Sequence, residues 1–236
     1  IEALIAEVAR QKKSDGGKAL AALKDEIAQA KKAWQADWRK HFESDEVPIN
    51  QYRVLGELMK HVDRDNTIVT HDSGSPREQT LPFWETTRAG TYMGWGKSTQ
   101  LGYGLGITLG AKLAAPDMLC MNIMGDGAFG MSGTDIETAA RSGAAITTVL
   151  LNNSAMATYS GPTQGTIGKE AREQYGVSTM HGDYAKIAEG MGAVGLRVTK
   201  PAELGPALRQ AQKLNAEGRA VLIDVKANVE DRRSRF

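Results

Sequence analysis

The sequence predicts an α/β fold in which a parallel sheet carries helices on both faces, preceded by a helical linker. Two observations lead to this prediction. From Ile49 onward, short apolar runs alternate with segments of helical period. The apolar runs show little of the apolar-polar alternation of a half-exposed strand, which indicates strands buried on both faces, as in a sheet whose crossovers are helices.

The elements are expected as follows. Strands are predicted at Thr67–His71, near Tyr92–Gly94, and at Met118–Met124, Ile146–Leu151, Val194–Val198 and Ala220–Val225. Helices are predicted between them at Asn50–Val62, Leu101–Leu113, Gly133–Ser142, Tyr184–Met191 and Ala202–Asn215. Residues 154–182 lack a clear period, and a long irregular stretch in an α/β domain often has a functional role.

The first part of the chain differs in composition from the rest. Residues 1–47 are rich in Ala, Lys, Glu and Gln with a helical period, which Asp15-Gly16-Gly17 is expected to break. We interpret them as a helical linker or the tail of a preceding domain, followed by a domain at 48–228 and a tail at 229–236. The chain begins with Ile1 inside a helical pattern, so we expect either that an upstream segment was removed or that the chain is one piece of a longer polypeptide.

The bulk composition excludes several classes of protein. The 236 residues are 41% hydrophobic and 24% charged, which is typical of a soluble globular protein. The net charge of +1 gives no reason to expect nucleic acid or an acidic membrane as a partner. The single cysteine, Cys120, excludes a disulfide framework. No apolar run approaches the roughly 20 residues of a membrane span, and a cytoplasmic location is expected.

A glycine-rich motif follows the strand at Met118–Met124 and has two interpretations. Gly125-Asp-Gly-Ala-Phe-Gly130 matches the G-x-G-x-x-G pattern of dinucleotide-binding proteins, which suggests a nicotinamide or flavin dehydrogenase. That pattern needs an acid at the end of the next strand to bind the ribose. The next strand ends instead in Asn152-Asn153, and Asp126 occupies the position that a pyrophosphate must approach. Both features disfavour the dehydrogenase.

The second interpretation is a divalent cation that anchors a diphosphate. Asp126 and Asn153 follow two different strands, and strand ends of a parallel sheet meet at one edge, so both side chains can face one crevice. Carboxylate, amide and carbonyl oxygens suit Mg²⁺, whose coordination is usually completed by phosphate and water. Gly127 permits close backbone approach, and the helix that follows presents free N–H groups to an anion.

These residues resemble the thiamine diphosphate (ThDP) motif, G-D-G followed after about two dozen residues by N-N. Over residues 48–228 the chain is similar to the C-terminal domain of the acetolactate synthase and 2-oxoacid decarboxylase family. The resemblance implies a three-layer, Rossmann-like ThDP-binding fold. It also implies that Asp126, Asn153 and the backbone carbonyl of Ala155 bind Mg²⁺.

The resemblance implies further cofactor contacts. His71-Asp-Ser-Gly-Ser75 is similar to the family's Asp-x-Gly turn, which assigns Ser73, Gly74 and Ser75 to the diphosphate. In the segment before Gly102-Tyr-Gly104, Leu101 corresponds to the residue that holds the cofactor in a bent V shape, and the carbonyl of Thr99 to the acceptor for its 4′-amino group. The remaining expected cofactor contacts are Gly125, Gly127, Ala128 and Met156.

The family's catalytic glutamate lies on an N-terminal pyrimidine-binding domain, across a dimer interface. We therefore expect this chain to depend on an upstream domain or on another chain for that glutamate, and to form a homo- or hetero-oligomer, a dimer or tetramer. FAD, where a family member has it, is also bound upstream. His71 and His181 are considered for proton transfer, but an ordinary turn or surface histidine is the favoured interpretation of each.

The reaction remains open between three classes. The first is 2-oxoacid decarboxylation or carboligation of the acetolactate synthase type. The second is an oxalyl-CoA decarboxylase or 2-hydroxyacyl-CoA lyase, because the run Phe129–Thr138 is similar to theirs and residues 154–164 lack the Trp-containing stretch of acetolactate synthases. The basic tail Asp231–Phe236 is interpreted as a solvated terminus, or alternatively as a lid over an acyl-CoA phosphate. In residues 154–164, Met156 and Tyr159 are candidates for the substrate side or for packing. The third class is a non-catalytic cofactor-binding subunit.

Overall fold

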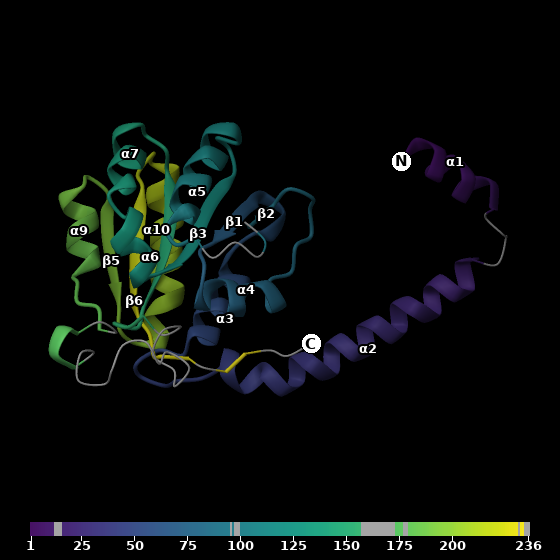
Figure 1. Ribbon diagram of the computed structural model, residues 1–236, viewed down its shortest axis with the longest axis horizontal. Coiled ribbons are helices and arrows are strands. Elements are labelled where there is room, and N and C mark those ends of the chain that lie inside the picture. The colour runs from purple at the N-terminus through teal and green to yellow at the C-terminus, as the bar shows by residue number, and fades with distance from the viewer. Residues whose placement is uncertain are drawn as a thin grey trace. The chain divides into compact units, whose positions relative to one another are not determined.

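The computed structural model in Figure 1 describes residues 1–11, 16–94, 96, 100–156, 173–176, 179–230 and 232–233. The chain divides into two compact units, Ile1–Lys40 and His41–Phe236. The division at 1–47, 48–228 and 229–236 stays a prediction. The second unit includes the segment before Pro48, and the backbone at Ala227 pairs with Ile49.

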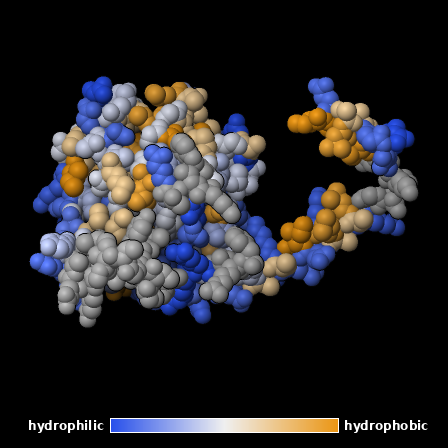
Figure 2. Space-filling view, viewed as in Figure 1, coloured by the Kyte–Doolittle hydropathy of each residue, from blue (hydrophilic) through white to orange (hydrophobic). Residues whose placement is uncertain are grey.

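The first unit is helical, as the composition predicts. It contains α1 (Glu2–Gln11) and most of α2 (Gly16–Phe42). The interruption of the helix was predicted to extend to Gly17, but α2 already begins at Gly16. Figure 2 shows apolar side chains on the surface of both helices; these exposed residues are Leu4, Ile5, Val8, Leu20, Leu23 and Ile27.

The second unit is built on a six-stranded sheet in which every pairing is parallel, with strand order β2-β1-β3-β4-β6-β5. The strands are β1 (Thr67–His71), β2 (Tyr92–Met93), β3 (Leu119–Gly125), β4 (Ile146–Asn152), β5 (Val194–Val198) and β6 (Val221–Lys226). Each lies within two residues of its predicted bounds. The fold class predicted from the sequence is confirmed.

Helices cover both faces of this sheet. They are α3 (Gln51–His61), α4 (Ser75–Phe83), α5 (Tyr103–Ala114), α6 (Asp126–Ser132), α7 (Asp135–Arg141), α9 (Tyr184–Gly190) and α10 (Leu204–Ala216), with short 3₁₀ turns η1 (Arg64–Asn66) and η3 (Pro201–Glu203). Right-handed crossovers put α5, α7 and α9 on one face and α4 and α10 on the other. Helix α3 packs against α10 and α4 on that second face (Figure 1).

Three helices begin two residues later than predicted, those expected to start at Leu101, Gly133 and Ala202. The helix expected at Gly133–Ser142 is α7, which begins two residues later, and a separate helix α6 begins at Asp126 itself. The glycines of the 125–130 motif disfavour a helix locally. Ala128 and Phe129 are buried in the core, however, and their packing outweighs that preference. The sequence prediction also missed α4, a short helix that contains Pro76 and Pro82.

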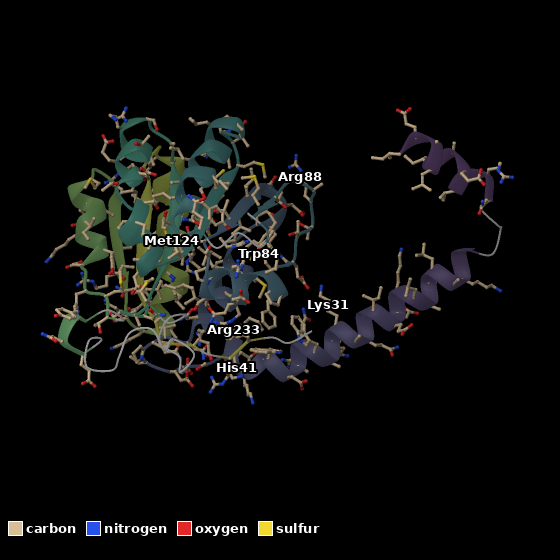
Figure 3. The ribbon with its side chains drawn as sticks, in the orientation of Figure 1. Lys31, His41, Trp84, Arg88, Met124 and Arg233 are labelled. Atoms are coloured by element: carbon tan, nitrogen blue, oxygen red, sulfur yellow. The ribbon has the colours of Figure 1, made fainter. Side chains whose placement is uncertain are left out.

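The core on the α5–α7–α9 face is apolar near its centre. It includes Met124, which lies at the end of β3 inside the body of the domain (Figure 3). A buried polar group lies between β1, β3 and α5: the Thr70 and Thr108 hydroxyls are 2.6 Å apart, and Thr70 donates to Asn122 Oδ1 at 3.1 Å. Across the part of the chain that the structure describes, no helix combines the length and apolar character that a bilayer span requires.

Candidate functional site

A cavity lies where β1, β3 and β4 end, with an empty volume of about 450 Å³. Its lining contains every described residue that the sequence analysis assigned to the cofactor. These residues are Ser73, Gly74, Ser75, Leu101, Gly125, Asp126, Gly127, Ala128, Asn153, Ala155 and Met156. Thr99 lies outside the described residues, as does Tyr159. Gln51, Pro76 and Leu151 also line the cavity and were not predicted.

Asp126 provides a carboxylate that is only half satisfied. The residue is 2% exposed, and its Oδ1 accepts a hydrogen bond from its neighbour's backbone, Gly127 N, at 2.9 Å. Its Oδ2 is buried and has no hydrogen-bond partner within the described residues. Burial raises the pKa of Asp126, opposed by the backbone N–H groups of Gly127 and Ser154. A buried acceptor without a donor destabilises the fold. This oxygen is therefore a candidate ligand for a cation, or an acceptor for another donor.

Asn153 belongs to a tight turn directly after β4. Its Oδ1 accepts a hydrogen bond from Ala155 N at 3.0 Å, and the residue between them, Ser154, has φ of 56°, in the left-handed region. Ser154 O accepts from Met180 N at 2.9 Å, and Ala155 bridges to Thr179. The turn therefore has a defined shape that brings the Asn153 amide and the Ala155 backbone to the same cavity as Asp126.

The donor set of this cavity suits a hard cation more than a soft one. Among the described residues, there is no group of three or more His, Cys, Asp or Glu side chains able to bind a metal ion. The lining offers instead the Asp126 carboxylate, the side-chain amides of Gln51 and Asn153, and backbone carbonyls. Such oxygen donors are those of Mg²⁺ sites, where the protein provides few ligands and phosphate provides others. The residues present thus fit a Mg²⁺-diphosphate group.

The opposite wall of the cavity is the turn after β1. Gly74 has φ of 80°, a conformation that strongly favours glycine, and α4 begins at Ser75 immediately after it. The first backbone N–H groups of a helix have no hydrogen-bond acceptor within the helix, so they can bind an anion. The Ser73 hydroxyl donates to Gln100 O at 2.7 Å, which joins this turn to the segment before Leu101.

Glycine at position 127 keeps the cavity wall close. A Cβ there would lie 2.5 Å from Met156 Sδ, so any larger residue would displace that side chain. Gly127 also follows Asp126 within the first turn of α6. The second glycine of the motif therefore has a packing reason in addition to close approach of a ligand.

His71 lies at the end of β1 and is 2% exposed. Its Nδ1 is 3.1 Å from Asp72 O and 3.4 Å from the Tyr103 hydroxyl, and its ring packs near Tyr92. Burial lowers the pKa of His71. The residue does not line the cavity. His181 is exposed and does not line it either.

Comparison with known protein families gives a match over residues 72–225, to the C-terminal TPP-binding domain of thiamine pyrophosphate enzymes. Thiamine pyrophosphate is another name for thiamine diphosphate. The chain belongs to this family. The matched residues include the β1 turn, the Gly125-Asp126-Gly127 motif and Asn152-Asn153.

Individual relatives agree with this membership. The chain is 32% identical over 218 residues to an acetolactate synthase of Bacillus subtilis, covering 89% of this chain and 37% of the relative. It is 31% identical over 167 residues to a probable acetolactate synthase of Mycobacterium bovis, covering 71% and 30%. The chain thus spans about a third of the length of these relatives.

A solved structure shares the fold of this TPP-binding domain. It is the thiamine diphosphate-dependent 4-hydroxybenzoylformate decarboxylase of Rhodococcus jostii RHA1, with a TM-score of 0.66 and 22% identity. The match covers 80% of this chain and 34% of that one. At this identity the similarity establishes the architecture alone.

Three residues of the TPP-binding domain that support its cavity were not predicted from the sequence. Gln51 lines the cavity, and two residues before it Ile49 pairs with Ala227. No local sequence motif predicts the position of Gln51. Asp72 is buried beneath the β1 turn, and its place in the Asp-x-Gly pattern was the available signal. Asp224 lies under the Asn152-Asn153 turn, inside a strand that reads as apolar.

Proposed function

We propose that this domain binds ThDP with its diphosphate in the cavity, anchored by Mg²⁺ through the Asp126 carboxylate, the Asn153 amide and the Ala155 carbonyl. The observation that carries the proposal is the buried Asp126 Oδ2, which has no donor among the described residues. A cation there would compensate the buried charge, and a diphosphate would complete its coordination. The first turns of α4 and α6 add backbone N–H groups that favour the anion.

The role of the chain's residues is to bind and orient the cofactor. Leu101 lies on the cavity wall and packs against the core, so we assign it the position between the two cofactor rings. Thr99 stays a proposed carbonyl acceptor for the 4′-amino group. When bound, ThDP supplies a nucleophilic carbon and an electron sink for making or breaking a C–C bond beside a carbonyl.

The reaction class that we propose is 2-oxoacid decarboxylation or carboligation. It is supported by relatives named acetolactate synthases and by their similarity over most of this chain. The acyl-CoA alternative rested on residues 154–164, most of which lie outside the described residues, and on the run Phe129–Thr138. In the structure this run forms parts of α6 and α7 and buries Phe129 and Ile136, so its similarity has a packing explanation.

We further propose that the catalytic glutamate comes from an upstream domain or another chain. None of the described cavity residues is a glutamate. Two buried glutamates are already engaged elsewhere: Glu57 with Arg53 and Lys60, and Glu230 with Asn50. The relatives are about three times longer than the stretch matched here, which leaves room for such a domain. FAD, if used, and the oligomeric state would also depend on that part.

Calorimetric titration of the full chain with ThDP tests the cofactor proposal. We expect binding that requires Mg²⁺ and that is lost in Asp126→Ala. Asp135→Ala is the matched control, since Asp135 lies exposed at the start of α7 and should bind as the wild type does. Binding that is independent of Mg²⁺, or unchanged in Asp126→Ala, would refute the metal assignment.

A separate assay tests the reaction and the partner. We expect the chain alone to be inactive with pyruvate and with oxalyl-CoA, and active with pyruvate when the upstream part of a family member is supplied. Activity of this chain alone would contradict the proposed origin of the glutamate. Activity with oxalyl-CoA only would replace the proposed reaction class by the acyl-CoA class.

A further inference from the structure

A buried pair of side chains lies beneath the Asn152–Ala155 turn. Asp224, on β6, is 0% exposed and Asn152, at the end of β4, is 2% exposed. Asn152 Nδ2 donates to Asp224 Oδ1 at 2.7 Å, between two neighbouring strands. This is a short, charge-assisted hydrogen bond in a dry environment, where such bonds are strong.

The pair is connected to the turn above it. The Ser154 hydroxyl donates to Asn152 Oδ1 at 3.3 Å, and Ala227 N donates to Asn152 O at 2.9 Å. The Asn152 side chain is thus bound on one side by Asp224 and on the other by the residue between Asn153 and Ala155. Rotation of the Asn152 amide would remove both side-chain contacts at once, because each uses a different end of that amide.

Asp224 and Asp126 both act on the buried phenol of Tyr184. Burial, then the charge of Asp126, then that of Asp224 raise the pKa of Tyr184 to about 12. Both carboxylates are therefore close enough to the same buried phenol to repel its ionised form. The backbone N–H of Ser154 is one of the groups that lowers the pKa of Asp126, so the turn also reaches this carboxylate.

The apolar packing of the sheet does not explain this acid. Asp224 Oδ2 has no hydrogen-bond partner within the described residues, so a strand with an apolar residue at this position would avoid a buried charge. Burying this carboxylate destabilises the fold, and within the described residues its hydrogen-bond partner is Asn152. This combination indicates a role in shaping the turn.

We propose that Asp224 is a positioning residue of the ion site: its carboxylate orients Asn152, which fixes the turn that presents Asn153 and Ala155. The inference rests on the proposed function, since it concerns the two ligands that the turn would provide. It assigns no direct contact with metal or cofactor to Asp224. Residues that orient the ligands of a metal site typically change its affinity by about 10–100-fold when removed.

Two substitutions separate positioning by the hydrogen bond from a simple effect of charge. Asp224→Leu keeps approximate volume but removes the acceptor. Asp224→Asn removes the charge and keeps an oxygen that can accept from Asn152 Nδ2. If the hydrogen bond matters, Asp224→Asn retains the Mg²⁺-dependent ThDP binding that Asp224→Leu loses. If only the negative charge matters, both variants are equally weak.

The experiment measures binding to the full chain, by calorimetry with ThDP and Mg²⁺ and by the electron paramagnetic resonance of Mn²⁺ bound with ThDP. We expect Asp224→Leu to weaken Mg²⁺-dependent ThDP binding by about 10–100-fold. Asp224→Asn should stay within about threefold of the wild type and retain its Mn²⁺ spectrum, since the hydrogen bond to Asn152 is kept. Thr148→Val is the matched control, because Thr148 is a buried polar residue of β4, the strand of Asn152, four positions before Asn152.

Circular dichroism and gel filtration establish that each variant is folded. If Asp224→Leu does not fold, Ser154→Ala tests the same chain of contacts from the exposed turn, with an expected loss of about two- to tenfold for one hydrogen bond. Wild-type affinity in a folded Asp224→Leu, or in Ser154→Ala when it stands in for that variant, would overturn the proposal. So would an Asp224→Asn variant as weak as Asp224→Leu. Absence of Mg²⁺-dependent binding in the wild type would instead refute the proposed function, and this inference with it.

Discussion

The carboxylate of Asp72 binds the backbone N–H of Gly102 with both of its oxygens, at 3.0 and 3.1 Å. The same side chain accepts from Ser73 N at 2.8 Å and from Gly104 N at 3.1 Å. Asp72 is 0% exposed. It therefore joins the turn after β1 to the start of α5, and these two segments form two walls of the candidate site.

Asp72→Ala should destabilise the fold strongly, because it leaves three buried N–H groups without an acceptor. We expect the free energy of unfolding to fall by about 3 kcal/mol, at the upper end for loss of buried partners. Urea denaturation measures this change. Asp117→Ala, which removes an exposed acid after α5, should change it by less than about 0.5 kcal/mol. Equal effects of the two substitutions would show that the contacts of Asp72 contribute little.

Two glycines of α5 should respond oppositely to alanine. A Cβ at Gly104 would lie 2.5 Å from Asn122 Oδ1 and 3.1 Å from Asp72 Oδ2, both on buried side chains, whereas nothing lies within 4 Å of a Cβ at Gly106. Gly104→Ala should cost about 2 kcal/mol or more through overpacking. Gly106→Ala should gain up to about 1 kcal/mol from helix propensity. Thermal unfolding of both variants provides the measurement, and a harmless Gly104→Ala would contradict the described packing.

His71 should make stability depend on pH near neutrality. Burial lowers its pKa from the ordinary 6.5, so the folded chain keeps this residue neutral while the unfolded chain takes up a proton below that pH. The free energy of unfolding should therefore fall as pH falls below about 6.5, until the pKa of the folded state is passed. The carboxyl of Asp72, whose pKa burial raises from 3.8, acts in the opposite direction at lower pH.

Urea denaturation between about pH 7.5 and about pH 5 tests this dependence. His71→Gln should flatten the decline, and the exposed His181→Gln should preserve it. Parallel curves for wild type and His71→Gln would show that another group causes the pH dependence.

Asp126→Asn should raise the free energy of unfolding without ligand and lower it, relative to the wild type, with Mg²⁺ and ThDP bound. Without metal, the substitution removes a buried charge whose Oδ2 has no partner among the described residues, and should raise the free energy of unfolding by about 1 kcal/mol. With Mg²⁺ and ThDP, the wild type should gain about 3 kcal/mol at a hundredfold excess over the dissociation constant. The variant should gain much less. Thermal melts in both conditions measure this, and equal ligand-induced shifts would count against a role of Asp126 in binding.

The sequence predicted the sheet and most of the site because the informative residues lie at strand ends. Asp126 follows β3 and Asn153 follows β4, so a correct assignment of two apolar strands was sufficient to predict one shared crevice. Strand bounds were accurate since buried parallel strands read as apolar runs between turn residues. The family pattern then assigned roles that spacing alone did not.

The unpredicted parts depend on contacts between distant segments. Gln51 reaches the cavity through the pairing of Ile49 with Ala227, and Asp224 contacts Asn152 across two strands. Neither contact has a local pattern. Helix α4 was missed because its two prolines argue locally against a helix, although Pro76 stands in the first turn, where its missing N–H costs nothing.

The central claim is that one cation lies between the Asp126 carboxylate and the turn after β4. A crystal structure of the chain with ThDP and Mn²⁺ tests it most directly, because Mn²⁺ takes the same ligands as Mg²⁺ and can be located by its anomalous scattering. We predict one Mn²⁺ bound by Asp126 Oδ2, the Asn153 amide oxygen, the Ala155 carbonyl and diphosphate oxygens. A Mn²⁺ ion bound without Asp126 and Asn153, or a diphosphate outside the cavity, would contradict this account.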